Sequence, residues 1–460
     1  MQYCIHGHFY QPPREDPISN YIPDEIGAEP FRNWNERILA ECYAPNAASA
    51  NFAKISFNIG PTLFRWMESA YPDVYQSVID QERSNYIQFH AGNGMAQAYN
   101  HTILPLASKL DKITQIRWGV KDFEYRFGHL PAGMWMPETA ADMETLCVMS
   151  DAGLSFTILS PWQVKPLTVQ PGPYLIPLPG SRKPFIVFTY DRDVSTQISF
   201  IPSATADGDR FLNNLNKSFG STPDGLRLFA SDGELYGHHQ HFRDYFLTYI
   251  LNGGGVRHGI EWTWPERWLK TNQVKAIADL NERTSWSCLH GVERWAGTCD
   301  CTPDSDWKKP MRFALNQLER WLDDVYLTAL NYYFEDAWEL RHRYIDVMDN
   351  QLTLRQLVNQ LTIAEISEAE LTRIDLLLKA QYERQRMYTS CGFFFDEFHR
   401  IEPQNSIAYA ANSVWLTKKA TGRELPREIM ELFKLVRSKK TGLRADTVFS
   451  QTLIRAQAED

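Results

Sequence analysis

The segment Leu226-Arg-Leu-Phe-Ala-Ser-Asp232-Gly-Glu234-Leu-Tyr-Gly-His238-His239 sets the pattern from which the fold can be predicted. A short apolar run leads into Ser-Asp-Gly, which predicts a buried strand that ends in a turn. Functional groups of α/β barrels gather at the carboxyl ends of such strands. Because an isolated Asp-Gly is more often a surface turn, the functional interpretation needs a second segment of the same kind.

A second segment, Ala132-Gly-Met-Trp135-Met-Pro-Glu138-Thr-Ala-Ala141, repeats the order of apolar run, carboxylate and helix. Strand and helix patterns alternate throughout the first half of the chain, which favours a parallel sheet or barrel. The predicted strands are Gln2–His8, Lys54–Asn58, Tyr86–His90, Ala132–Met136, Phe156–Leu159, Phe185–Tyr190 and Leu226–Ala230. Between the fifth and sixth strands, Val164–Lys183 is rich in Pro and Gly and predicts an irregular excursion.

The alternation ends after the glycine triplet 253–255, and from about residue 308 the composition is helical. The predicted helices are Met311–Phe334, Asp336–Met348, Leu352–Leu361, Ser367–Met387 and Arg427–Arg437. Ser367 and Glu370 have the spacing of a capping box at the start of the fourth. We therefore expect an α/β catalytic domain over residues 1–300 and an α-helical region over 301–460.

The composition of the chain indicates which kinds of binding partner and which cellular compartment to expect. The net charge of −9 argues against nucleic-acid and anionic-membrane surfaces, which select clustered Lys and Arg. Aromatic residues make up 13% of the chain, and their flat amphipathic rings are useful in carbohydrate sites. The sequence shows neither the pattern of a signal peptide nor an apolar run of membrane-spanning length. Its seven cysteines are scattered, which is more typical of reduced thiols than of a set of disulfides. These features predict a cytoplasmic protein.

One group of cysteines could hold a metal. Cys288, His290, Cys299 and Cys301 offer four soft ligands within fourteen positions. Zinc motifs usually contain C-x₂₋₄-C pairs, from which C-x-H and C-x-C depart. A structural metal is therefore the minority interpretation, and no cofactor is expected for the reaction.

Two carboxylates at the ends of different strands, in a chain rich in aromatics, suit cleavage of a glycosidic bond. One carboxylate attacks the sugar, and the other must hold a proton near neutral pH, which an apolar setting and a negative neighbour favour. Trp135 could form such a wall beside Glu138. Each acid could equally be a salt-bridge partner or a helix cap. Only the order of apolar run, carboxylate and helix that the two segments share favours catalysis.

Histidines supply further candidates. His6 and His8 lie two apart on the first predicted strand and would point to the same side. They could bind sugar hydroxyls, ligate a metal or pack in the core. His101 follows a loop with two glycines, and His238 follows the Asp232 segment, with the same alternatives open.

These segments resemble the motifs of glycoside hydrolase family 57. The first motif is similar to His6-Gly-His8-Phe-Tyr-Gln11-Pro, the second to residues 92–106 with His101, and the third to Gly133-Met-Trp135-Met-Pro-Glu138. The fourth resembles Asp232-Gly-Glu234-Leu-Tyr-Gly-His238, and the fifth is loosely similar to residues 284–295, with Trp286 and Trp295.

The resemblance implies a distorted (β/α)₇ barrel followed by a helical region, and a retaining enzyme acting on α-glucans. Glu138 would be the nucleophile and Asp232 the general acid/base. The residues that would contact substrate are His6, His8, Gln11, His101, Trp135, Glu234, His238, Trp286 and Trp295.

Two other functions stay open at this point. A metal-dependent carbohydrate hydrolase or deacetylase on a related barrel would use His6, His8, Asp232 and His238 as ligands. A glycan-binding relative without turnover would retain the fold alone. The sequence does not separate hydrolysis from transfer, because that depends on how well water is excluded.

Overall fold

The computed structural model describes residues 2–165, 171–218 and 225–459. The chain divides into two compact units, each of which combines separate segments. The first unit contains Met1–Gln11, Asp24–Ala98 and Asp122–Trp286, and the second contains Pro12–Pro23, Tyr99–Lys121 and Ser287–Asp460. The predicted domain boundary near residue 300 stays a prediction.

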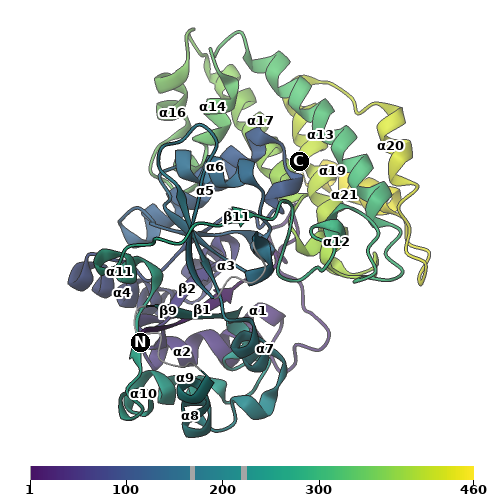
Figure 1. Ribbon diagram of the computed structural model, residues 1–460. Coiled ribbons are helices and arrows are strands. Elements are labelled where there is room, and N and C mark those ends of the chain that lie inside the picture. The colour runs from purple at the N-terminus through teal and green to yellow at the C-terminus, as the bar shows by residue number, and fades with distance from the viewer. Residues whose placement is uncertain (1, 166–170, 219–224, 460) are drawn as a thin grey trace. The chain divides into compact units, whose positions relative to one another are not determined.

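Parallel strands organise the first unit. They are β1 (Gln2–Phe9), β2 (Ser56–Ile59), β3 (Ala96–Gln97), β4 (Met134–Trp135), β5 (Phe156–Leu159), β8 (Phe185–Thr189) and β9 (Leu226–Asp232). Among them, β1, β2 and β9 lie side by side (Figure 1). Parallel ladders join β9 to β1, β1 to β2, β3 to β4 and β5 to β8. The predicted α/β architecture is confirmed.

Single backbone contacts connect these ladders into a ring. Phe57 of β2 bridges Gly94 before β3, and Gly133 before β4 bridges Phe156 of β5. After β8, the Asp191 N–H donates to the Leu228 carbonyl of β9 at 2.7 Å. Because the ladders within the described ranges form separate sheets rather than one closed sheet, the barrel is a distorted one.

Helices follow most of these strands. They are α1 (Trp34–Ile38), α2 (Ala44–Ala48), α3 (Pro61–Ala70), α4 (Pro72–Phe89), α5 (Lys109–Phe127), α6 (Met143–Asp151), α7 (Arg192–Phe200), α8 (Gly208–Ser218), α9 (Arg243–Tyr249), α10 (Gly255–Arg257) and α11 (Pro265–Thr271). Four short strands lie outside the ring: β6 (Val164–Lys165), β7 (Gly172–Ile176), β10 (Glu261–Trp262) and β11 (Asp279–Leu280). The division between the two units falls within α5.

The inward side chains of the strands form a buried apolar core. Alternate residues of a strand point to the same side, and on β9 Leu226, Leu228 and Ala230 all belong to this core. Cys4 belongs to it on β1. The same alternation continues to His6 and His8 on β1 and to Asp232 on β9, so the inward row changes from apolar to polar at the carboxyl end.

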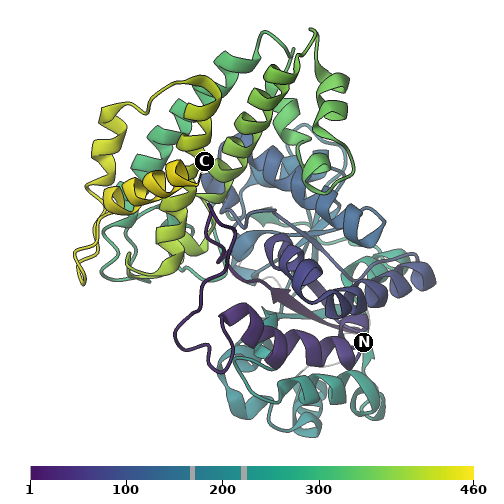
Figure 2. The same cartoon turned by 180° about the vertical axis from the view of Figure 1, so that it is seen from behind.

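The second unit is helical (Figure 2, green to yellow). Its remaining helices are α12 (Glu293–Ala296), α13 (Lys308–Leu330), α14 (Ala337–His342), α15 (Ile345–Met348), α16 (Leu354–Leu361), α17 (Glu368–Arg386), α18 (Cys391–Phe394), α19 (Ile401–Thr421), α20 (Arg427–Phe433) and α21 (Ala445–Ala458). The capping box of Ser367 and Glu370 is present at the start of α17. A buried ion pair holds α17 to α5, because Arg384 donates to Asp111 at 2.7 Å.

One local prediction was wrong, a second was incomplete, and two helices were missed. Tyr86–His90 is the end of α4 and the residue after it rather than a strand, and the third strand follows at Ala96–Gln97. Tyr86 and Ile87 are exposed, so their apolar character does not reflect burial in a sheet. The excursion Val164–Lys183 contains β6 and β7, with residues 166–170 outside the described ranges. The helices α19 and α21 were not predicted.

Within the described ranges, every helix is too short or too polar to cross a membrane.

Candidate active site

Asp232 ends the inward row of β9 and lies beside His8. The two residues are paired across the parallel ladder of β1 and β9, and neighbouring strands lie about 4.8 Å apart. Gly233 follows, and a Cβ there would come within 2.3 Å of the Phe9 ring. The glycine therefore allows β9 to turn tightly against β1 directly after the carboxylate.

The Asp232 carboxyl is reached by solvent but has protein around it on most sides. Loss of hydration raises its pKa from 3.8 to about 8, and the negative charges of Glu234 and Glu138 act in the same direction. Asp232 therefore holds its proton at neutral pH. A protonated carboxyl that is open to solvent can donate to a substrate.

Glu234 is buried and fixes the loop after β1. Its Oε1 accepts hydrogen bonds from the Tyr43 hydroxyl at 2.7 Å and from the Tyr10 N–H at 3.0 Å, and the Gln11 side chain also donates to it. Burial raises the pKa of Glu234 to about 7, although these hydrogen bonds oppose the rise. Glu234 and Gln11 thus position the loop and place a negative charge near Asp232.

Glu138 lies directly after β4 in a strained turn. Its φ of 57° and that of Thr139, 50°, are both left-handed, a conformation that costs non-glycine residues energy. The Thr139 N–H donates to the Met136 carbonyl at 2.8 Å, and the Thr139 hydroxyl donates to Gln163 at 2.8 Å. These hydrogen bonds hold the turn that carries Glu138.

Trp286 holds Glu138 at two points. The indole N–H donates to Glu138 Oε2 at 3.0 Å, and the Trp286 backbone N–H donates to the Glu138 carbonyl at 3.0 Å. A hydrogen bond to the charged form stabilises a carboxylate. The contact joins residues 148 positions apart, and it unites the third and fifth predicted motifs at one site.

Aromatic and imidazole rings line the space near these carboxyls. Trp135 stacks on His6 with centroids 4.8 Å apart and on His8 at 5.0 Å, and it meets Trp286 edge-on at 5.0 Å. Burial lowers the pKa of His6 to about 3 and that of His8 to about 4. Both rings are therefore neutral at physiological pH, and the site presents polar edges without positive charge.

Asn58 at the end of β2 positions both histidines. It contacts His6 Nε2 at 3.1 Å and His8 Nδ1 at 2.9 Å, and its own amide donates to Gln97 at 2.7 Å. The sequence reasoning missed Asn58, although it ends the second predicted strand. A polar residue at the end of an apolar run was the signal that could have identified it.

Two further residues were missed. Tyr43 binds Glu234, and Tyr190, which follows β8, interacts electrostatically with Asp232 and contacts the Ser160 hydroxyl at 2.8 Å. Burial raises the pKa of Tyr190 to about 12, so its hydroxyl keeps its proton. Both tyrosines occupy segments without a recognisable motif.

His238, His101 and Trp295 have other surroundings. The His238 ring nitrogen Nδ1 contacts the Glu41 carboxyl, and the ring meets Trp34 edge-on. In the second unit, His101 Nδ1 contacts the Ser390 hydroxyl at 2.6 Å, and Trp295 is buried against Phe394. The roles of all three in substrate binding stay predictions.

The alternative metal site of His6, His8, Asp232 and His238 does not assemble. Both nitrogens of His6 already contact Ser56 and Asn58. Among the described residues, the group of His, Cys, Asp and Glu side chains close enough to share an ion is the one at Cys288, His290, Cys299 and Cys301. That group belongs to the second unit, whereas the carboxyls belong to the first.

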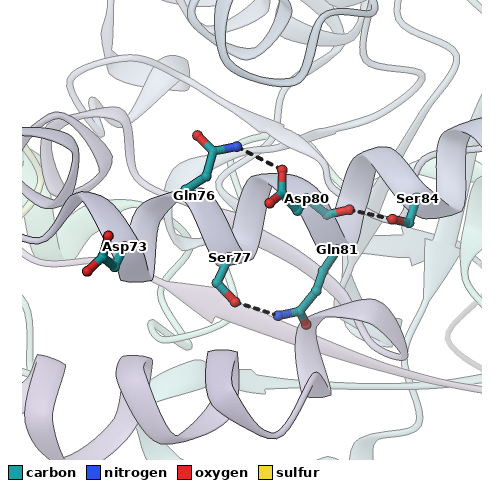
Figure 3. Close-up of a pocket in the computed structure, with 6 residues that line it drawn as sticks. All are labelled: Asp73, Gln76, Ser77, Asp80, Gln81 and Ser84. Carbon is teal, nitrogen blue, oxygen red and sulfur yellow. Dashed lines mark hydrogen bonds between the residues drawn. The ribbon is translucent and has the colours of Figure 1, made fainter.

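A separate pocket of about 430 Å³ lies along α4 (Figure 3). It is lined by Asp73, Gln76, Ser77, Asp80, Gln81 and Ser84. Gln76 donates to Asp80 at 2.8 Å and Gln81 to Ser77 at 3.1 Å, so the polar groups satisfy one another. All six residues come from a single helix, and none of them is a predicted site residue.

Fold and site together define an α/β-barrel protein in which two carboxyls, Glu138 and Asp232, lie near each other at the carboxyl ends of the strands. The chain belongs to glycosyl hydrolase family 57, whose family model matches residues 3–277. Residues 304–459 match a second model, described as a domain of unknown function, DUF3536.

Solved structures of similar fold include two archaeal enzymes. An exo-type maltose-forming amylase from Pyrococcus sp. ST04 is 16% identical with a TM-score of 0.76, and the match covers 98% of this chain and 88% of that one. A GH57-type branching enzyme from Pyrococcus horikoshii is 14% identical with a TM-score of 0.65, covering 97% and 96% of the two chains. At these identities the likeness shows the fold.

A curated relative matches a shorter stretch. Alpha-amylase 1 from Dictyoglomus thermophilum is 22% identical over 187 residues, which are 40% of this chain. The match spans 26% of the length of that relative.

Proposed function

We propose that this protein is a retaining glycoside hydrolase or transglycosidase that acts on α-1,4-linked glucans. The observation that carries the proposal is the meeting of two carboxyls at the carboxyl ends of the strands, Asp232 at the end of β9 and Glu138 after β4, where the negative charge of Glu138 helps to raise the pKa of Asp232. Two carboxyls with different protonation states at one site are what double displacement requires. Membership of family 57 and the amylase and branching-enzyme relatives support an α-glucan substrate.

In the first step, a Glu138 carboxylate oxygen attacks the anomeric carbon while the bond to the leaving oxygen breaks. Asp232 transfers its proton to that oxygen, and a glycosyl ester forms on Glu138. In the second step, the Asp232 carboxylate takes a proton from water or a sugar hydroxyl, whose oxygen attacks the anomeric carbon and releases Glu138. Both carboxyls then return to their starting states.

The surrounding residues have supporting roles in this proposal. The Trp286 indole N–H stabilises the attacking carboxylate and directs its oxygen. Trp135 stacks on both His6 and His8 and so holds the His8 ring in place beside Asp232 at the carboxyl end of β1. Because both imidazoles are neutral, they add no positive charge that would oppose the positive charge developing on the sugar.

Glu138→Gln tests the nucleophile, and Glu144→Gln on α6 is a matched control outside the site. We expect Glu138→Gln to lose turnover of maltooligosaccharides by at least about 10³-fold, as removal of a covalent nucleophile does, while the control keeps it. For Glu138→Ala with an activated α-glucosyl substrate, azide should occupy the vacated position and yield a β-glycosyl azide. Undiminished turnover by Glu138→Gln would contradict the assignment.

Product analysis separates the possible reactions of the intermediate. Shorter products from linear maltooligosaccharides indicate attack by water, longer linear products indicate transfer, and new branch points indicate branching. A cytoplasmic location, where such storage glucans are handled, is part of the same proposal.

A further inference from the structure

The second unit contains a compact group of sulfur and nitrogen ligands that the proposed reaction does not use. The Sγ atoms of Cys288, Cys299 and Cys301 and a ring nitrogen of His290 all lie within 4.8 Å of one another. Cys299 Sγ is 3.5 Å from Cys288 Sγ and 3.2 Å from His290 Nδ1, which is 3.5 Å from Cys301 Sγ.

These separations are close to the edges of a zinc tetrahedron. With Zn–S bonds of about 2.3 Å and Zn–N bonds of about 2.0–2.1 Å, tetrahedral angles place two sulfurs about 3.8 Å apart and sulfur and nitrogen about 3.5 Å apart. We propose that Cys288, His290, Cys299 and Cys301 bind one zinc ion in a structural site. Because the protein supplies all four ligands, no coordination position is left for a substrate.

The backbone presents the ligands on two tight turns. The Gly291 N–H donates to the Cys288 carbonyl at 3.2 Å, and the Thr302 N–H donates to the Cys299 carbonyl at 2.9 Å. Each turn therefore carries two ligands spaced i and i+2. The C-x-H and C-x-C spacings that departed from common zinc motifs are compatible with one ion because both turns face the same point.

Backbone N–H groups donate hydrogen bonds to two of the sulfurs. The Leu289 N–H donates to the Cys301 sulfur, and the Cys301 N–H donates to the Cys299 sulfur. Hydrogen bonds of this kind orient metal ligands.

A buried lysine near the cysteines would offset the negative charge of such a zinc centre. Three thiolates, one neutral imidazole and Zn²⁺ would carry a net charge of about −1. Lys308, at the start of α13, is fully buried and interacts electrostatically with Cys288 and Cys299. Its ammonium donates to the Thr302 hydroxyl at 3.0 Å. A buried cation facing the cysteines is expected if they are bound as thiolates.

A disulfide explains the group less well. The Cys288 and Cys299 sulfurs are 3.5 Å apart and not bonded, whereas a disulfide requires about 2.05 Å. A disulfide would also leave His290 and Cys301 without a reason to meet at the same point. A single ion accounts for all four side chains.

Zinc would fix the segment between the two turns. That segment contains α12, whose Trp295 is fully buried and packs against Phe394 of α18. Residues 287–307 consist mostly of turns and irregular backbone around the short helix α12, so the ion would contribute to the stability of this part of the unit as zinc does in other small sites.

The test uses the full chain purified under reducing conditions, and it needs no activity. Elemental analysis should find about one zinc per chain, and Co²⁺ exchange should give the intense visible absorption of a tetrahedral thiolate site together with sulfur-to-cobalt charge transfer. Cys301→Ser should weaken Co²⁺ binding by more than about tenfold, whereas Cys147→Ser on α6 should leave it unchanged.

Two results would overturn the proposal. One is the failure of the reduced wild-type chain to bind either Zn²⁺ or Co²⁺ with tetrahedral spectra, a measurement that stands even if Cys301→Ser does not fold. The other is a Cys288–Cys299 disulfide found by mass spectrometry in the reduced preparation. Since none of these measurements depends on turnover, loss of the proposed glycosidase function would leave the zinc proposal untouched.

Discussion

Replacing Glu234 with glutamine removes a buried negative charge that faces Asp232 while keeping the size of the side chain. The folded pKa of Asp232 is about 8 against an ordinary 3.8, a rise of about 4. Burial is the largest of three causes and Glu234 the second, so Glu234 contributes less than about 2 pH units. We expect Glu234→Gln to lower the pKa of Asp232 by about one pH unit.

The sign follows from the charges. Ionisation of Asp232 next to a carboxylate is opposed by like-charge repulsion, so removing Glu234 makes proton loss easier. The alkaline limb of kcat/KM against pH reports the acid of the free enzyme, and it should move from near pH 8 towards pH 7 in the variant. The measurement is initial-rate hydrolysis of a chromogenic maltooligosaccharide across this range.

Tyr43→Phe is the matched control. It removes the 2.7 Å hydrogen bond to Glu234 but keeps the carboxylate, so the alkaline limb should stay within about half a pH unit of that of the wild type. An unchanged or higher alkaline limb in Glu234→Gln would refute the electrostatic account of Asp232.

Two further predictions concern the geometry of the site. Trp286→Phe keeps an aromatic ring but loses the indole N–H that donates to Glu138. Because a hydrogen bond to a charged group contributes about 1.5–3 kcal/mol, kcat should fall roughly 10- to 150-fold with little change in melting temperature. A normal kcat would contradict this prediction. Gly233→Ala places a methyl group 2.3 Å from the Phe9 ring and should destabilise the fold by about 1–3 kcal/mol in chemical denaturation. Gly225→Ala, with nothing within 4 Å of the added carbon, should be neutral by the same assay.

The strands that carry the carboxyls could be predicted because their local patterns are decisive. The bounds of β5, Phe156–Leu159, were predicted without error, and the pattern before Asp232 identified β9. Both strands are apolar, buried and followed by a turn or helix. Where burial and periodicity agree in this way, a single sequence contains the needed information.

Other features depend on contacts between distant segments. Trp286 and Glu138 are far apart in the sequence, and only the fold shows that the indole N–H meets the carboxylate. The error at Tyr86 and Ile87 has a related cause: both are apolar yet exposed on α4, so composition predicted a burial that tertiary packing does not provide. Asn58 was missed because its partners come from another strand.

At the left-handed turn of Glu138, the residue that suits the backbone conformation differs from the residue that the proposed reaction requires. Glycine adopts a φ of 57° without strain, so the backbone of this turn costs about 1–3 kcal/mol with glutamate that it would not cost with glycine, whereas Glu138→Gly would remove the proposed nucleophile. Selection for stability alone would therefore tend to replace this glutamate. A relative that carries glycine at the position would be recognisable as one that has given up turnover and kept the barrel for binding.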